Sequence, residues 1–205
     1  MRGLYAITPD CAHSASLLAR AARALAGGVA ALQYRNKLAD HEQRLREARA
    51  LAQLCRDHGV PLIVNDDVAL ALAVGADGVH LGRDDSPLAA ARARLPGKLL
   101  GASCYDSLEA ARAARAAGAD YLAFGSVFPS PTKPQAVRAP LALFGQARAL
   151  GLPLVAIGGI TLQNAPQLVR AGADCVAVIS DLFDAPDVAA RATAYGSLFA
   201  HELAQ

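Results

Sequence analysis

Short apolar runs alternate with longer stretches rich in Ala, Arg and Leu along almost the whole chain. Each run is apolar at successive positions, which is typical of strands that are buried on both faces of a parallel sheet. The stretches between the runs are mostly long enough for crossover helices. The pattern predicts an α/β protein with a single (β/α)8 TIM barrel. The eight runs lie at residues 3–8, 29–34, 61–65, 77–82, 98–103, 120–125, 153–158 and 174–180.

A weak internal repeat distinguishes the even runs from the odd ones. Gly-Ala-Asp precedes the fourth, sixth and eighth runs and begins at Gly75, Gly118 and Gly172, whereas Gly-x-Pro-Leu precedes the third and seventh and begins at Gly59 and Gly151. A barrel interior alternates in the same way, because odd and even strands fill different layers. The glycines are expected at helix C-termini, where the chain takes a positive φ. An open doubly wound sheet explains this alternation less well.

Capping signals mark where helices begin. Asp40 with Gln43, and Asp106 with Glu109, have the spacing of capping boxes. The longest irregular piece of the chain is residues 125–139. A loop of this length in a compact domain is usually functional or mobile.

Composition and charge exclude several classes of protein. Hydrophobic residues make up 54% of the chain and charged residues 19%, which excludes a disordered protein. The net charge of +2 argues against a nucleic-acid partner held by a basic surface. Four cysteines lie far apart without metal-ligand spacing, and we expect reduced thiols in a cytoplasmic protein. The longest uncharged stretch, residues 149–169, is interrupted by Gly and Pro, so we expect no membrane span.

Polar residues gather where the runs end, which is the edge of a barrel at which active sites form. Gln33, Arg35 and Lys37 alternate, so they point to one side of an extended chain, and two cations beside an amide suit a polyanion. Asp66 and Asp85 follow the third and fourth runs, which are neighbours in a barrel. They could share Mg²⁺ that bridges to a substrate phosphate.

Other strand ends carry a second phosphate signal. Gly158, Gly159 and Ser180 close the last two runs, where backbone N–H groups of barrels commonly bind phosphate. Asp67 and Asp84, in contrast, are interpreted as helix N-caps or first-turn acids. The strand ends therefore predict a site for two phosphorylated ligands, one bound through a metal and cations and the other through backbone amides.

The histidines offer no catalytic base. His80 lies inside the fourth run and is interpreted as a core histidine, and the other four lie in helices or a loop. No Ser-His-Asp order or reactive cysteine context is present in the sequence.

Several segments, in order and in register, resemble the thiamine phosphate synthase family. The resemblance runs from Leu4 to about Phe183. The matching segments are LQYRNK (32–37), VNDD followed by ALAVGADGVHLGRDD (64–85), GASC (101–104), FGSVFPSPTK (124–133), AIGGIT (156–161) and AVIS (177–180).

The resemblance implies that residues 1–205 form a single TIM-barrel catalytic domain, a cytoplasmic transferase of thiamine biosynthesis. The family joins 4-amino-2-methyl-5-hydroxymethylpyrimidine diphosphate to 4-methyl-5-(2-hydroxyethyl)thiazole phosphate and releases diphosphate, with Mg²⁺ as cofactor. The reaction is dissociative, because diphosphate leaves before the thiazole nitrogen attacks. The expected partners are these small molecules, without nucleic acid or membrane, and a homo-oligomer is compatible with the sequence.

The resemblance also implies a role for each matching residue. Arg35, Lys37, Ser103 and Lys133 would be catalytic, and Asp66 and Asp85 would bind Mg²⁺. The pyrimidine diphosphate would be held by Gln33, Arg35, Lys37, Asn65, Ser103 and Lys133, and the thiazole phosphate by Ser130, Pro131, Thr132, Gly159, Ile179 and Ser180. Tyr34 and Asn36, within the same matching segment, would complete the substrate-binding set.

Three alternatives stay open. The related thiazole tautomerase branch is an isomerase on the same barrel, but it typically carries His at the position of Ser126. A non-catalytic barrel could bind thiamine precursors and regulate a partner. Another phosphate-binding barrel isomerase could use Asp66 as its base.

Overall fold

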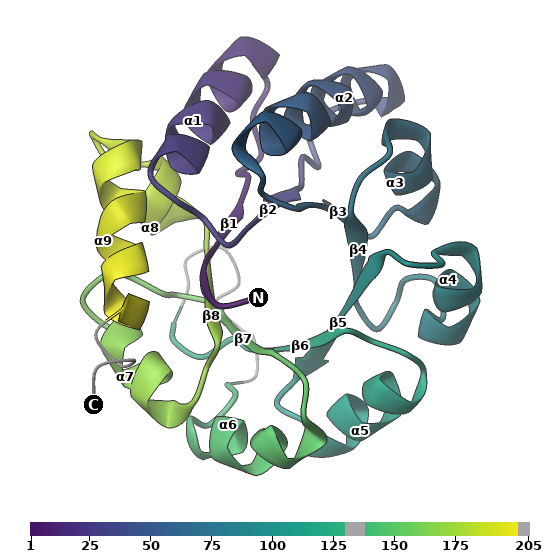
Figure 1. Ribbon diagram of the computed structural model, residues 1–205, viewed down its shortest axis with the longest axis vertical. Coiled ribbons are helices and arrows are strands. Elements are labelled where there is room, and N and C mark those ends of the chain that lie inside the picture. Colours follow the sequence, from purple (N-terminus) through teal and green to yellow (C-terminus); the bar gives the residue numbers. More distant parts are fainter. Residues whose placement is uncertain (130–137, 201–205) are drawn as a thin grey trace.

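The computed structural model describes residues 1–129 and 138–200. Within these residues, eight parallel strands close into one barrel, each pairing with the next in chain order and β8 with β1 (Figure 1). This confirms the predicted (β/α)8 barrel, and every strand lies within its predicted run except β5, which extends two residues further. The strands are β1 (Gly3–Ile7), β2 (Ala31–Tyr34), β3 (Leu62–Asn65), β4 (Gly78–Leu81), β5 (Leu99–Tyr105), β6 (Tyr121–Phe124), β7 (Leu154–Ile157) and β8 (Cys175–Val178).

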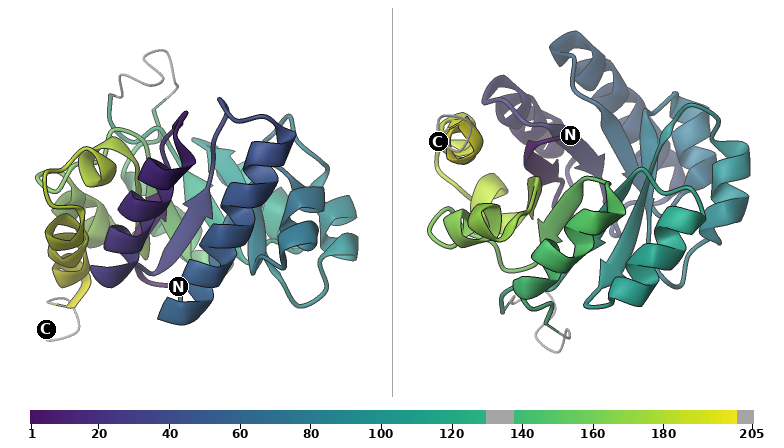
Figure 2. Two further views of the ribbon diagram at one scale, coloured as in Figure 1. Left: turned by 90° about the horizontal axis from the view of Figure 1, so that it is seen from above. Right: turned by 60° about the horizontal axis from the view of Figure 1, so that its bottom comes forward.

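The helices form an outer layer around the barrel (Figures 1 and 2). In the part of the chain that the structure describes, no helix is both long and apolar enough to cross a membrane. The helical segments are α1 (Ser14–Ala26), α2 (His41–His58), α3 (Val68–Val74), α4 (Leu88–Arg94), α5 (Leu108–Ala116), α6 (Ala142–Ala147), the short 3₁₀ helix η1 (Arg148–Leu150), α7 (Ala165–Ala171), α8 (Ser180–Phe183) and α9 (Val188–Ala200).

The Gly-Ala-Asp repeat ties an even strand to the odd strand before it. The glycines take a positive φ, as predicted, for example +67° at Gly75. In each repeat the Asp side chain accepts a backbone N–H near the start of the preceding odd strand, so the repeat fastens strands in pairs at their N-terminal edge. The pairs are Asp77 with Leu62 at 2.8 Å, Asp120 with Leu100 at 2.7 Å and Asp174 with Leu154 at 2.9 Å.

Two of the predicted helix caps are confirmed. Asp40 accepts the Gln43 N–H at 2.8 Å. Asp67 accepts the Leu70 N–H at 2.8 Å at the start of α3.

The other two predicted caps are wrong. Ser107, and not Asp106, caps α5 through the Ala110 N–H, because the helix begins one residue later than the spacing suggested. Asp84 lies in an exposed turn, and α4 begins further along the chain, after Pro87.

Side chains along the strands alternate between the barrel interior and the layer under the helices. The interior carries two rings in edge-to-face contact, Tyr5 and Tyr121, with centroids 5.9 Å apart. A Cβ at Gly101 would overlap the Tyr121 ring, so the glycine of β5 makes room for this side chain. Tyr121 can therefore reach across the interior from β6.

A buried carboxylate fastens α1, α2 and the end of β2 to one another. Glu47 of α2 is 1% exposed. It accepts hydrogen bonds from Ser14 at 2.6 Å, Tyr34 at 2.7 Å, Gln43 at 2.9 Å and Asn36 at 3.0 Å. Burial alone would raise the pKa of Glu47, but these donors outweigh it and hold the pKa below its usual range. The ionised carboxylate thus anchors the segment that follows β2.

Replacing Glu47 with Ala should lower the free energy of unfolding by about 3 kcal/mol, because the buried donors of Tyr34 and Asn36 lose their acceptor. Urea titration measures this loss. The depressed pKa of Glu47 makes its contribution complete above the unfolded pKa and lost as pH falls through the folded pKa. The gap between parent and variant should therefore narrow in acid. Glu42→Ala, at a side chain 86% exposed on the same helix, is the control and should change little; a gap that stays constant in acid would contradict the ionic role.

Candidate active site

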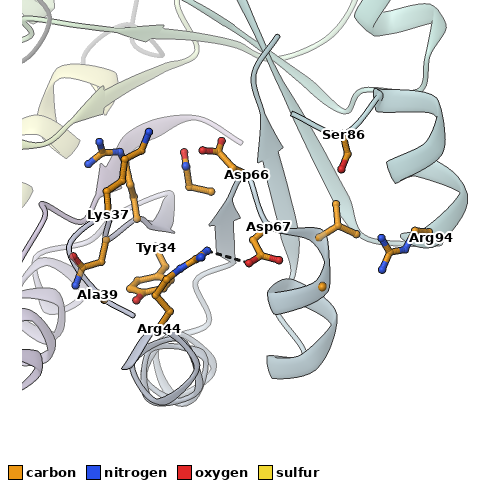
Figure 3. A pocket seen from close by; sticks show the side chains of 13 residues that line it. Tyr34, Lys37, Ala39, Arg44, Asp66, Asp67, Ser86 and Arg94 are labelled. Carbon is orange, nitrogen blue, oxygen red and sulfur yellow. Dashed lines mark hydrogen bonds and ion pairs between the residues drawn. The ribbon is translucent and has the colours of Figure 1, made fainter. Parts of the chain in front are cut away.

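A cleft of about 620 Å³ opens at the C-terminal ends of β2 and β3 and extends toward α4. In Figure 3, Lys37 from the β2 side and Asp66 from the end of β3 point toward the same space. Arg44 of α2 and Asp67 also line the cleft, and they form an ion pair at 3.1 Å, below Lys37 and Asp66 in the view of Figure 3. The cleft therefore brings cations and carboxylates from separate strands together, as the sequence predicted.

The segment after β2 that carries Arg35 and Lys37 is held in place by residues that follow β1. Thr8 is fully buried; its Oγ1 accepts the Arg35 N–H at 2.8 Å and donates to the Arg35 carbonyl at 2.7 Å. Asp10 accepts from the Arg35 guanidinium at 2.9 Å and from the Lys37 N–H at 2.6 Å. Burial would raise the pKa of Asp10, but these two donors lower it overall. Sequence reasoning gave Asp10 no role; its only signal was an acid shortly after a strand end.

Tyr34 and Asn36 line the cleft but use their polar atoms within the protein. The Tyr34 hydroxyl donates to Glu47. Asn36 accepts the Cys11 N–H at 3.2 Å and donates to the Cys11 carbonyl at 2.7 Å, besides its bond to Glu47. The geometry favours a supporting role for both, beneath the segment that carries Arg35.

Two carboxyl groups from neighbouring strand ends face each other. Asp66 has a φ of +64°, and its N–H donates to the His80 carbonyl at 2.9 Å. The Asp85 carboxylate accepts the Gly82 N–H at 2.6 Å. Burial, followed by the hydrogen bond and charge of Asp85, raises the pKa of Asp66 to about 6, and Lys37 opposes this shift. Two carboxylates held this close are short of positive charge.

The donor set fits a hard divalent cation. Carboxylate oxygens are the protein ligands that Mg²⁺ prefers, and Mg²⁺ usually takes only one or two of them. Within residues 1–129 and 138–200, no group of three or more His, Cys, Asp or Glu side chains suits a metal ion. Water and substrate oxygens would therefore complete the coordination of an ion at Asp66 and Asp85.

Gln33 and Ser103 lie at the top of the barrel interior, joined by a chain of hydrogen bonds. Gln33 Nε2 donates to the Tyr5 hydroxyl at 2.8 Å, and the two tyrosine hydroxyls are 2.8 Å apart. The Tyr121 hydroxyl is 3.1 Å from His80 Nδ1, and His80 Nε2 is 2.8 Å from Ser103 Oγ. Burial lowers the pKa of His80 to about 4, so the ring is neutral at pH 7. His80 is a core histidine, as predicted, but it contacts a predicted site residue.

The opposite rim is formed by the ends of β7 and β8, with Gly158 and Gly159 after β7 and Ile179 and Ser180 after β8. Val127 and Phe128 donate backbone N–H bonds to the carbonyls of Ile157 and Gly158, both at 3.0 Å. A Cβ at Gly159, whose φ is +63°, would collide with the carbonyl oxygens of Phe128 and Pro129. This close approach of the chain requires glycine there, whether or not phosphate binds. The predicted residues Ser130, Pro131, Thr132 and Lys133 lie outside the described residues.

Comparison with known proteins agrees with the resemblance in the sequence. A family model described as thiamine monophosphate synthase matches residues 4–182. The chain is 63% identical over 202 residues to the thiamine-phosphate synthase of Azoarcus sp. (strain BH72), with 98% of each covered, and 60% identical over 200 residues to that of Chromobacterium violaceum, with 97% of each covered. The solved structure of a thiamine phosphate pyrophosphorylase from Pyrococcus furiosus matches with a TM-score of 0.88 and 36% identity, covering 98% of this chain and 96% of that one. The chain belongs to the thiamine monophosphate synthase family.

Proposed function

We propose that the chain joins hydroxymethylpyrimidine diphosphate to thiazole phosphate, giving thiamine phosphate and diphosphate, a transferase step of thiamine biosynthesis. Membership of the family supports the reaction. The observation that carries the site assignment is the pairing across one cleft of two cations, Arg35 and Lys37, with the Asp66 carboxyl group, which Asp85 faces. Cytoplasmic location and a homo-oligomeric state stay predictions from the sequence.

The first task of the site is to bind the diphosphate and ease its departure. Mg²⁺, held by Asp66 and Asp85, would neutralise charge on the diphosphate oxygens. Arg35 offers a planar fork for two phosphate oxygens, and its bond to Asp10 keeps that fork oriented before substrate arrives. Lys37 adds a point charge on the same side, with Asn65 at the adjacent strand end.

The second task is to align the thiazole and exclude water. Gly159, Ile179 and Ser180, at the ends of β7 and β8, would hold the thiazole phosphate, with Ser130, Pro131 and Thr132 assigned on the resemblance alone. Lys133 is assigned to the departing diphosphate on the same ground. Because the bond to diphosphate breaks before the new bond forms, the protein supplies charge and alignment in place of a base.

Asp66→Asn and Asp85→Asn should each slow product formation about 100-fold and weaken its dependence on Mg²⁺, since each removes one charge from the ion site. The measurement is formation of thiamine phosphate and diphosphate from the two precursors over a Mg²⁺ series. Asp84→Asn is the matched control, because this neighbouring acid lies in an exposed turn. Full rates with an unchanged Mg²⁺ response in both variants would refute the ion site.

Asp66→Asn should stabilise the metal-free protein at pH 7 by about 1 kcal/mol, a figure discounted because Asp66 is only half-buried. The folded pKa of about 6 exceeds the ordinary value of 3.8, so the native state binds more protons across that interval. Stability of the parent should therefore fall as pH rises from about 4 to 6. Thermal unfolding over a pH series, with a chelator present throughout, measures this fall in stability. Asp84→Asn is again the control. A variant less stable than its parent at pH 7 would contradict the proposed repulsion.

Arg35→Ala should raise the KM for the pyrimidine diphosphate and lower kcat, together about 30-fold in kcat/KM, because the guanidinium contacts diphosphate both before and during its departure. The KM for the thiazole phosphate should stay near its parent value. Arg46→Ala, at a side chain 66% exposed on α2, serves as control. Steady-state kinetics with each substrate varied decides the point; equal effects on both KM values would indicate general damage to the barrel.

A further inference from the structure

Five polar side chains cross an otherwise apolar barrel interior. They come from five strands: Tyr5 from β1, Gln33 from β2, His80 from β4, Ser103 from β5 and Tyr121 from β6. Four of the five residues in this hydrogen-bonded chain are well shielded from water, with Tyr5 1%, Tyr121 2%, Gln33 3% and His80 8% exposed. Since water cannot satisfy these groups, each proton must have an acceptor within the chain of side chains.

Counting protons gives the chain a direction. The Gln33 amide nitrogen can only donate, so Tyr5 accepts from it and has a single proton left for Tyr121. Tyr121 then passes its own single proton to His80 Nδ1. Because Nδ1 accepts from Tyr121, the imidazole ring carries its proton on Nε2, which donates to Ser103 Oγ.

The opposite direction leaves a conflict in the interior. If His80 Nδ1 carried the proton, it would donate to Tyr121, and Tyr121 would donate to Tyr5. The Tyr5 oxygen would then accept from both Tyr121 and Gln33, and its own buried proton would have no acceptor. An unmet buried donor is costly, so the orientation of the Gln33 amide selects the direction of the whole chain.

We propose, on the basis of the proposed function, that this hydrogen-bonded chain of side chains fixes which group donates and which accepts in the pyrimidine subsite. Gln33 Oε1 is presented to the ligand as an acceptor, and Ser103 is presented as a donor, because its oxygen already accepts from His80. Tyr5, Tyr121 and His80 are positioning residues for these two ends. An aminopyrimidine offers the complementary pair, an N–H donor and a ring-nitrogen acceptor, whereas an oxo-pyrimidine reverses both.

The first test reads the direction without any substrate. In ¹⁵N-labelled protein, five histidines give signals, and the signal of His80 is the one that is lost in the His80→Gln variant. Two-bond ¹H–¹⁵N correlation should show a protonated Nε2 and an unprotonated Nδ1. A ring protonated on Nδ1, or a mixture of both tautomers, overturns the proposal. Because no substrate is present, this result is independent of whether the protein makes thiamine phosphate.

The second test asks whether the chain acts through Ser103. Tyr121→Phe should lower kcat/KM for the pyrimidine diphosphate about 10-fold in the parent, yet less than about 2-fold in a Ser103→Ala background, since both changes remove the same oriented donor. The control is Tyr195→Phe, which removes another buried hydroxyl, bonded to Asp181 at 2.7 Å, and should have the same small effect in both backgrounds. Equal losses from Tyr121→Phe in both backgrounds would mean that Tyr121 acts only by packing, and would overturn its positioning role.

Discussion

Closure of the parallel sheet fixes the position of everything that the site uses. The pairing of β1 with β8, from Gly3 opposite Cys175 to Ala6 opposite Val178, completes the barrel. All eight strands then end at one edge, so side chains far apart in the sequence converge there. The outer helices add a second constraint, since Glu47 ties α2 to the segment after β2 and so determines where Arg35 emerges.

Charge is distributed over that edge in a way that favours ligand binding over stability. Asp66 and Asp85 raise the free energy of the unliganded protein by facing each other, and burial adds to the effect. Across the cleft, Asp10 orients the Arg35 guanidinium without hiding it, since Arg35 remains partly exposed. A ligand that brings a cation to the acids and phosphate oxygens to Arg35 relieves both sides at once.

The sequence was sufficient for features that depend on periodicity and strand ends. The apolar runs predicted all eight strands, and the strand ends predicted the cleft that Arg35, Lys37 and Asp66 line, with Asp85 beside Asp66. It was insufficient for contacts set by barrel register: Asp10 contacts Arg35 and Lys37 because β1 lies beside β2, and nothing in the sequence pattern singled out Glu47. The misplaced caps at Asp106 and Asp84 have a related cause, because the start of a helix depends on how the strand before it ends.

The hydrogen-bonded chain through the interior was not predicted from the sequence. The free-energy cost of burying its polar groups indicates that it has a role beyond packing. Phenylalanine at Tyr5 and Tyr121 would fill nearly the same volume and require no hydrogen bonds, so the hydroxyls are not needed for packing. A buried polar network is tolerated only when every member is satisfied, and that condition here permits one order of donors and acceptors. The orientation of the Gln33 amide is therefore coupled, through the order of donors and acceptors, to the orientation of the Ser103 hydroxyl. An apolar core could not provide this coupling. What the chain contributes is a fixed polarity at two points of the subsite, set before the substrate enters.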